Sequence, residues 1–252
     1  MNKISKPIIV GNWKATPKDL KTAITFVKTL EQKISKTKIK KNYLLAVPDV
    51  YINSLSSITK HGLIGAENLT GKEEGQTTGL NTPLMLSSVG ASFIILGHSE
   101  VRKRGETSEV IKEKLQVTLS KNIKTILCVG EEKRDPSGDY IKFIEEELKE
   151  CLELSKKEDF KNLIIAYEPI WAIGGSSPAT TNECFEMVIA IRRTLVELLG
   201  IDSAKKISIL YGGTVTKENA SEFIEEASVD GLLIGRASQN VEDFYSIIKS
   251  CI

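Results

Sequence analysis

The chain has 252 residues, of which 41% are hydrophobic and 27% are charged. Counted with glycine and without tyrosine, its hydrophobic share falls within the globular range of roughly 45–50%, which excludes a disordered, collagen-like or coiled-coil protein. Lysine and arginine number 34 against 33 aspartates and glutamates, so the net charge of +1 lacks the basic excess typical of proteins that bind nucleic acid or an anionic membrane surface.

Short apolar runs alternate along the chain with longer amphipathic stretches, as strands alternate with helices in an α/β protein. The runs are almost continuously apolar, which is expected for parallel strands buried on both faces. In chain order, the predicted strands span residues 8–10, 43–47, 63–66, 93–96, 125–129, 163–167, 207–211 and 231–234. The clearest predicted helices span residues 17–34, 108–120, 140–154, 182–199, 217–226 and 241–249.

The predicted strands recur about every 30 residues, which is the size of a strand–helix crossover unit. Eight such units without a second composition class favour one (β/α)8 barrel domain over residues 1–252, rather than an open doubly wound sheet. One segment interrupts this rhythm. The polar, glycine-rich stretch 71–79 after the third predicted strand is too long for an ordinary crossover. It is either a flexible excursion or a projecting contact loop.

The four cysteines lie far apart and form no Cys-x-x-Cys motif or Cys/His cluster, so we expect neither a zinc site nor a disulfide scaffold. We interpret Cys128 as a small buried hydrophobe and His61 as an exposed residue at a helix end. The first residues lack the long apolar segment of a secretory signal. The longest apolar stretch, 163–175, is too short to cross a membrane. We therefore expect a cytoplasmic protein without membrane contact.

Polar residues gather at the carboxyl ends of the predicted strands, where (β/α)8 barrels carry their active sites. Asn12 and Lys14 follow the first strand, His98 follows the fourth and Glu168 follows the sixth. A carboxylate that faces a histidine suits general-base catalysis, although Glu168 could instead form a structural ion pair with Lys14. Ser99 is adjacent to His98 in the chain and no Gly-x-Ser-x-Gly elbow occurs, so we discount a serine nucleophile.

Glycines follow the seventh and eighth predicted strands, at Gly212-Gly213 and at Gly235. A backbone without side chains lets N–H groups approach an anion closely. Barrels of this kind commonly hold phosphate in the loops after strands seven and eight. The sequence therefore predicts a phosphate site at these glycines.

Five motifs carry a family resemblance: Gly11-Asn12-Trp13-Lys14, Gly97-His98-Ser99-Glu100, Cys128-Val129-Gly130-Glu131, the nine residues 166–174, and Tyr211-Gly212-Gly213. In this order and over essentially the whole chain, they resemble triosephosphate isomerases. The resemblance implies a cofactor-independent, metal-free enzyme of glycolysis and gluconeogenesis. Its substrates would be dihydroxyacetone phosphate and D-glyceraldehyde 3-phosphate, interconverted through an enediol(ate).

The resemblance also implies residue roles. Glu168 would remove and return a carbon-bound proton, while neutral His98 would polarise the carbonyl and move protons between the two oxygens. Lys14 would stabilise the enediolate electrostatically, and Asn12 would donate a hydrogen bond to a substrate oxygen. Residues 169–179 would form a lid that excludes water. The phosphate would be held by the backbone N–H groups of Gly174, Thr214, Gly235 and Arg236.

This chain departs from the family pattern at several places. The lid reads Gly175-Ser176-Ser177-Pro178 where Thr-Gly-Lys is common, and the segment 98–105 is one residue short. Arg236 stands where glycine is frequent, and Thr214 replaces a frequent serine. The remaining departures are Leu80 in place of a usual glutamate and Val101 in place of a usual arginine.

The resemblance implies a homodimer in which the 71–79 loop of one chain, with Thr78 near its tip, inserts beside the active site of the other. If Leu80 and Val101 face each other there, an apolar contact replaces an ion pair.

Two alternative functions stay open. One is another phosphate-binding (β/α)8 enzyme, although an aldolase would have only Lys14 for a Schiff base, and a metal-dependent epimerase only His98 as a ligand. The other is a catalytically silent barrel scaffold.

Overall fold

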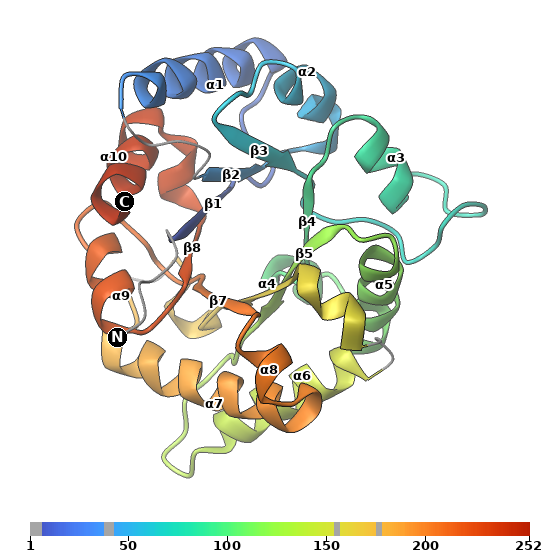
Figure 1. The fold of residues 1–252 in the computed structure, drawn as a ribbon, viewed down its shortest axis with the longest axis vertical. Coiled ribbons are helices and arrows are strands. Elements are labelled where there is room, and N and C mark those ends of the chain that lie inside the picture. Colours follow the sequence, from blue (N-terminus) through green and yellow to red (C-terminus); the bar gives the residue numbers. More distant parts are fainter. Residues whose placement is uncertain (1–6, 38–42, 154–156, 175–177) are drawn as a thin grey trace.

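The computed structural model describes residues 7–37, 43–153, 157–174 and 178–252. Eight parallel strands form one curved sheet ringed by helices (Figure 1). The strand order is β3-β2-β1-β8-β7-β6-β5-β4, and an isolated parallel bridge between Ala66 and Ile94 joins the two ends of the sheet. The predicted (β/α)8 barrel is therefore confirmed. None of the helices described here is long and apolar enough to cross a membrane.

All eight predicted strands are present. Their bounds are β1 (Ile8–Asn12), β2 (Tyr43–Ala46), β3 (Gly62–Gly65), β4 (Phe93–Leu96), β5 (Lys124–Val129), β6 (Leu163–Tyr167), β7 (Ser208–Tyr211) and β8 (Gly231–Ile234).

The described helices include all six that the periodicity predicts. They are α1 (Leu20–Ser35), α2 (Ile52–Ser56), α3 (Pro83–Ser88), α4 (Ser99–Lys103), α5 (Ser108–Ser120), α6 (Asp139–Leu152), α7 (Thr181–Leu199), α8 (Ile201–Ala204), α9 (Ala220–Glu226) and α10 (Val241–Cys251). The 3₁₀ turns are η1 (Asp49–Tyr51), η2 (Lys157–Asn162), η3 (Ile170–Ala172) and η4 (Arg236–Gln239).

Two predicted helix starts are wrong by three residues, and in each case a local hydrogen bond explains the difference. The first helix begins at Leu20 instead of residue 17, because the side chain of Asp19 accepts a hydrogen bond from the Thr22 backbone N–H at 2.8 Å and caps it. The helix α9 begins at Ala220, since Asn219 accepts a hydrogen bond from the backbone N–H of Thr216 and shapes a turn before it. Residue 154, the predicted end of the helix that corresponds to α6, lies outside the described residues.

The core has two layers because successive strand residues point to opposite faces. In β5, for example, Ile126 and Cys128 point into the barrel, whereas Leu127 and Val129 pack beneath the helices. Cys128 is fully buried, as predicted, and this burial raises the pKa of its thiol. The barrel interior is thus filled by side chains and is not a channel.

The prediction for His61 is wrong. This residue lies in the bend between α2 and β3, and its Nδ1 atom is 2.6 Å from Oε2 of Glu31 in α1. The Tyr43 hydroxyl donates a hydrogen bond to the other carboxylate oxygen at 2.5 Å. Although burial raises the pKa of Glu31, the hydrogen bonds from Tyr43 and His61 lower it more. This carboxylate joins α1, β2 and β3 at the amino ends of the strands.

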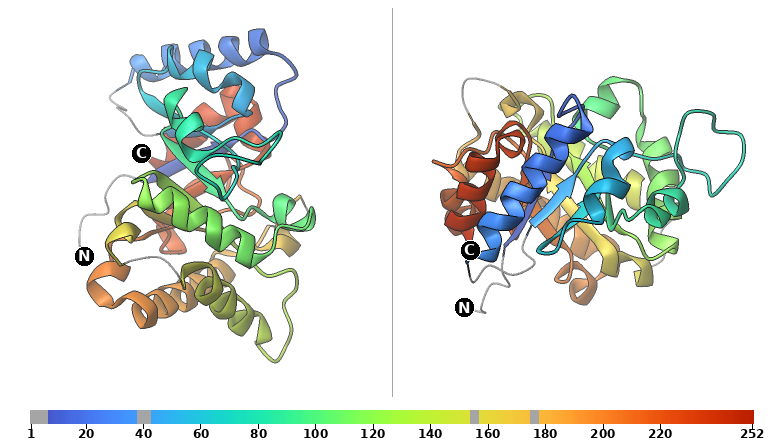
Figure 2. Two further views of the ribbon diagram at one scale, coloured as in Figure 1. Left: turned by 90° about the vertical axis from the view of Figure 1, so that its right-hand side faces the viewer. Right: turned by 90° about the horizontal axis from the view of Figure 1, so that it is seen from above.

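The segment 71–79 projects away from the barrel between β3 and α3 (Figures 1 and 2). Thr78 is exposed, as are most of its neighbours in this loop. Both interpretations of this segment agree with a loop that projects from the barrel.

Gly130, directly after β5, packs against the backbone of the neighbouring strand. A Cβ atom at this position would lie 1.7 Å from the carbonyl oxygen of Glu168. We therefore expect Gly130→Ala to lower the free energy of unfolding, measured with urea, by about 3 kcal/mol. The control is Gly138→Ala, which strains the backbone at a φ of +80° but introduces no clash, because no atom lies within 4 Å of the added Cβ. It should cost only about 1 kcal/mol, and equal losses in the two variants would contradict the argument.

Candidate active site

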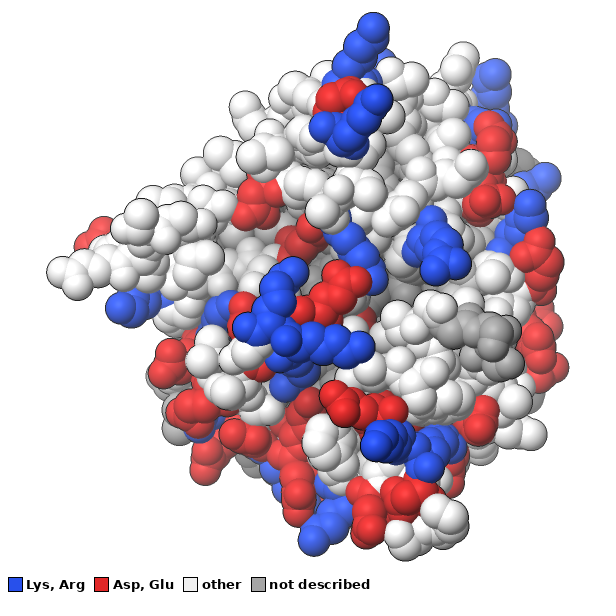
Figure 3. Space-filling model, turned by 180° about the vertical axis from the view of Figure 1, so that it is seen from behind, with Lys and Arg blue, Asp and Glu red and all other residues white. Residues whose placement is uncertain are grey.

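The carboxyl ends of the strands open into a cavity of about 670 Å³. Figure 3 shows this face of the barrel, with acidic and basic side chains around its central hollow. The cavity is lined by all eight residues that the sequence assigned to the site: Asn12, Lys14, His98, Glu168, Gly174, Thr214, Gly235 and Arg236. Within the described ranges, no group of three His, Cys, Asp or Glu side chains is arranged to hold a metal ion.

Glu168 follows β6 and is 2% exposed. Its Oε2 atom accepts a hydrogen bond from the Ser99 backbone N–H at 3.0 Å, and its Oε1 atom lies 3.2 Å from Nε2 of His98. The alternative ion pair between Glu168 and Lys14 is not present. Lys14 instead pairs with Glu100, with 2.5 Å between Nζ and Oε1. The buried carboxylate therefore faces the histidine, in the arrangement that a general base requires.

His98 caps the short helix α4, and this fixes the orientation of its ring. The Nδ1 atom accepts a hydrogen bond from the backbone N–H of Glu100 at 3.1 Å. An imidazole nitrogen that accepts a hydrogen bond carries no proton, so the proton of the neutral ring is on Nε2. His98 therefore presents an N–H donor to the cavity.

Lys14 has a backbone φ of +57°, a left-handed conformation that costs a non-glycine residue about 1 kcal/mol. The Asn12 side chain stabilises this turn, since its Oδ1 atom accepts a hydrogen bond from the Lys14 N–H at 3.1 Å. With Oδ1 engaged, the Asn12 amide nitrogen is the group left to donate to a ligand. The two residues thus form one structural unit at the end of β1.

Gly174, Thr214 and Gly235, from the loops that follow β6, β7 and β8, also line the cavity. A Cβ atom on Gly235 would lie 3.7 Å from Cε of Lys14, so this stretch of backbone runs beside the lysine side chain. The Thr214 hydroxyl donates a hydrogen bond to the carbonyl of Ala172 at 2.6 Å, which ties the loop after β7 to η3. Gly174 has a φ of +69°, a conformation that glycine adopts without strain. Glycine backbone next to a cation is suited to an anion with several oxygens.

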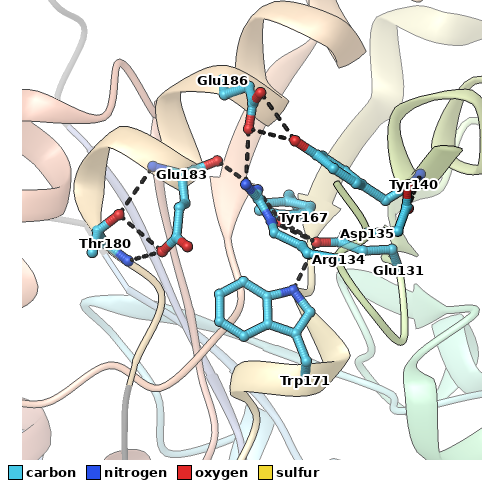
Figure 4. A network of polar contacts seen from close by, with 9 residues as sticks. All are labelled: Glu131, Arg134, Asp135, Tyr140, Tyr167, Trp171, Thr180, Glu183 and Glu186. Atoms are coloured by element: carbon cyan, nitrogen blue, oxygen red, sulfur yellow. Dashed lines mark hydrogen bonds and ion pairs between the residues drawn. The ribbon is translucent and has the colours of Figure 1, made fainter. Parts of the chain in front are cut away.

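The sequence analysis missed a polar network at the base of the proposed lid (Figure 4). Glu131 is 2% exposed, and its Oε1 atom accepts hydrogen bonds from the Tyr167 hydroxyl and the Trp171 Nε1–H, each at 2.8 Å. Arg134 contacts the same oxygen and also pairs with Glu186 of α7 at 2.8 Å. The network fixes η3, which leads to Gly174. Glu131 and Trp171 belong to the motifs quoted above, and their place in those motifs was the one signal from which the sequence analysis could have identified this network. The lid residues 175–177 lie outside the described residues.

Glu67, just beyond β3, is a second residue that the sequence analysis missed. Burial raises its pKa to about 8; the Lys14 backbone N–H acts in the opposite direction, and the neighbouring Asp49 and Glu100 carboxylates raise it further. Its Oε1 atom has no hydrogen-bond partner among the described residues. A half-buried carboxyl group with a raised pKa therefore lies beside the turn that carries Lys14.

The chain is similar in sequence to known proteins along nearly its whole length. A sequence model of the family described as "Triosephosphate isomerase" matches residues 7–251. The chain is 37% identical over 249 residues to the triosephosphate isomerase of Caldanaerobacter subterraneus subsp. tengcongensis, an overlap of 97% of this chain and 99% of that protein. It is 36% identical over 251 residues to the enzyme of Thermoanaerobacter pseudethanolicus, and 37% identical over 250 residues to that of Porphyromonas gingivalis, with the same coverage.

The raised pKa of Glu67 predicts a pH-dependent stability. Between the ordinary carboxyl pKa of 4.5 and about 8, the folded chain keeps a proton that the unfolded chain releases, so stability falls as the pH rises through this window. We expect Glu67→Gln, which cannot ionise, to raise the free energy of unfolding by about 2 kcal/mol at pH 8 and by little at pH 5.

Urea unfolding of the two proteins at intervals between pH 5 and 8 measures this difference. Glu150→Gln, at an exposed position of α6, is the control and should leave the pH dependence unchanged. A difference between wild type and Glu67→Gln that stays constant with pH would show that Glu67 is ionised throughout.

Proposed function

Because the chain belongs to the triosephosphate isomerase family, we propose that the residues lining its cavity perform the interconversion of dihydroxyacetone phosphate and D-glyceraldehyde 3-phosphate. That reaction is the activity of the family and a step of glycolysis and gluconeogenesis. The observation that carries the residue assignment is the buried Glu168 carboxylate, 3.2 Å from Nε2 of a histidine whose other nitrogen accepts a backbone hydrogen bond.

In this proposal Glu168 is the general base. Its carboxylate removes a proton from the carbon next to the substrate carbonyl and returns it to the adjacent carbon. In the structure the carboxylate is held by the Ser99 N–H and by His98. The substrate carbons must lie within reach of this carboxylate.

His98 acts on the oxygens of the substrate. Its Nε2–H donates a hydrogen bond to the carbonyl oxygen, where negative charge develops as the carbon loses its proton. After the charge has formed, the same nitrogen can transfer its proton to one oxygen and recover a proton from the other. Asn12 contributes a second donor through its amide group.

Lys14 supplies positive charge to the enediolate and to the phosphate. Its side chain is 27% exposed, and its ammonium group pairs with Glu100. In a cavity shielded from water, a fixed cation stabilises developing negative charge more than it would in solvent. The phosphate is bound by the backbone N–H groups of Gly174, Thr214, Gly235 and Arg236.

The alternative functions have less support. An aldolase needs an unpaired lysine to form a Schiff base, whereas Lys14 is engaged with Glu100 at the cavity rim. A silent scaffold would have no reason to keep a carboxylate buried beside a histidine, because burial of a charge is unfavourable unless a function or a partner requires it.

We also propose a homodimer formed through the loop 71–79 and α3. Three large apolar side chains in and next to α3 are more than half exposed: Leu80, Leu84 and Met85. Such clustering beside a projecting loop supports an interface. Val101, by contrast, is only 5% exposed, so it offers little surface to a partner and does not support the predicted contact with Leu80.

For location we propose the cytoplasm, because all four cysteines are free thiols.

We expect Glu168→Gln to lower kcat about 1,000-fold or more while the protein still binds a phosphorylated enediolate mimic, since a positioned base acts mainly in the chemical step. A coupled assay with purified protein and glyceraldehyde 3-phosphate measures kcat, and calorimetry measures binding. Glu218→Gln is the matched control, because it removes the same charge from the same cavity away from the base. Unchanged turnover in Glu168→Gln would show that another group takes the proton.

The dimer can be tested with Met85→Glu, which would place an unpaired charge in the proposed interface. We expect the dissociation constant to rise about 100-fold, corresponding to roughly 3 kcal/mol. Ile189→Glu is the control, because Ile189 is 53% exposed and belongs to α7, a helix on another side of the barrel from α3 (Figure 1). Light scattering over a range of protein concentrations measures both variants. A wild-type monomer at micromolar concentration would refute the proposal.

A further inference from the structure

Several charged or titratable side chains that line the cavity have a partner of opposite type. Lys14 pairs with Glu100 at 2.5 Å, His98 with Glu168 at 3.2 Å, and Lys217 with Asp243 at 3.2 Å. Arg236, which also lines the cavity, is different. Its guanidinium forms no hydrogen bond or ion pair with any residue that the structure describes.

Arg236 also lies next to Gly235, a residue of the proposed phosphate site. It is the first residue of η4 and directly follows Gly235, whose backbone runs beside the Lys14 side chain. The residue is exposed and is one of those that line the same cavity as Glu168 and His98. An arginine at the rim can therefore extend toward a ligand that is held by the Gly235 backbone, without first breaking an internal contact.

The chemistry of the proposed ligand matches this free cation. A phosphate monoester carries close to two negative charges at neutral pH. Backbone N–H groups donate hydrogen bonds but carry no net charge, and the charge of Lys14 is partly balanced by Glu100. A guanidinium has a planar set of donors that can bind two phosphate oxygens at once.

We propose that the guanidinium of Arg236 binds the phosphate group of the substrate directly and so helps the enzyme to select phosphorylated trioses. The inference rests on the proposed function and deepens it. The backbone N–H of residue 236 is available whatever its side chain, and the family frequently has glycine here. The arginine therefore adds a contact that a glycine cannot make.

The expected size of the effect follows from the exposure of Arg236. Water and salt screen a contact at the cavity rim, so its contribution is modest and decreases as ionic strength rises. We expect Arg236→Gln to raise KM for glyceraldehyde 3-phosphate about fivefold at low ionic strength, and less at 0.3 M salt. The inhibition constant of inorganic phosphate should rise by a similar factor, and kcat should stay within about twofold of wild type.

Three comparisons separate a direct contact from other effects. Arg236→Lys keeps the charge but not the paired donors, and its KM should lie between those of wild type and Arg236→Gln. Lys217→Gln removes one positive charge from the same cavity wall, but from a residue already paired with Asp243, and its KM should stay within about twofold of wild type. Turnover of unphosphorylated glyceraldehyde should not respond to Arg236→Gln.

Some results would overturn the inference. The side chain does not bind phosphate if Arg236→Gln leaves both KM and the inhibition constant of phosphate unchanged. An equal rise of KM in Lys217→Gln would show that only the summed charge of the cavity matters. If wild-type protein fails to turn over glyceraldehyde 3-phosphate, the proposed function fails. Calorimetric binding of inorganic phosphate to wild type, Arg236→Gln and Arg236→Lys still decides the role of Arg236 in that case. Thermal melts of the three proteins show whether each is folded.

Discussion

The carboxylate of Glu168 is buried at the mouth of the barrel, and a charge in that place is stable only if hydrogen-bond donors face it. At the beginning of α4, the Ser99 backbone N–H donates a hydrogen bond to this carboxylate, and Nε2 of His98 lies 3.2 Å from its other oxygen. The position of α4 therefore determines the chemistry of the site. It depends on Gly97, whose φ of +70° turns the chain from β4 into this helix. On the other side, Gly130 leaves room for the backbone of residue 168.

A second set of contacts connects this carboxylate with the proposed lid. The strand that ends at Tyr167 leads to Glu168, and the Tyr167 hydroxyl shares Glu131 Oε1 with Trp171. One buried oxygen thus holds both the strand before the base and the 3₁₀ turn after it. Arg134 extends the network to α7, the helix that follows the lid. The base and both ends of the lid are therefore attached to the same rigid frame.

The sequence predicts the barrel well, because each strand is an apolar run whose pattern does not depend on its neighbours. The bounds of β4, β6 and β8 agree with their predicted ranges. The strand-end rule and the family resemblance also identify eight of the residues that line the cavity. Short helices such as α4 were missed, since five residues cannot show a periodic pattern. Side-chain partners were missed for a different reason: the ion pair of Lys14 with Glu100 joins residues 86 positions apart, and only the paths of two loops bring them together.

The left-handed backbone of Lys14 has a consequence for how this sequence can change. Glycine or asparagine at position 14 would relax the turn, yet both would remove the ammonium group that faces the cavity. Local stability and chemistry therefore favour different residues at this one position. Selection for heat resistance alone would accept the loss of this lysine, whereas selection for turnover retains a strained residue. Changes at Asn12, which stabilises this turn, or at Glu100, which pairs with the ammonium group, would act on the same conflict.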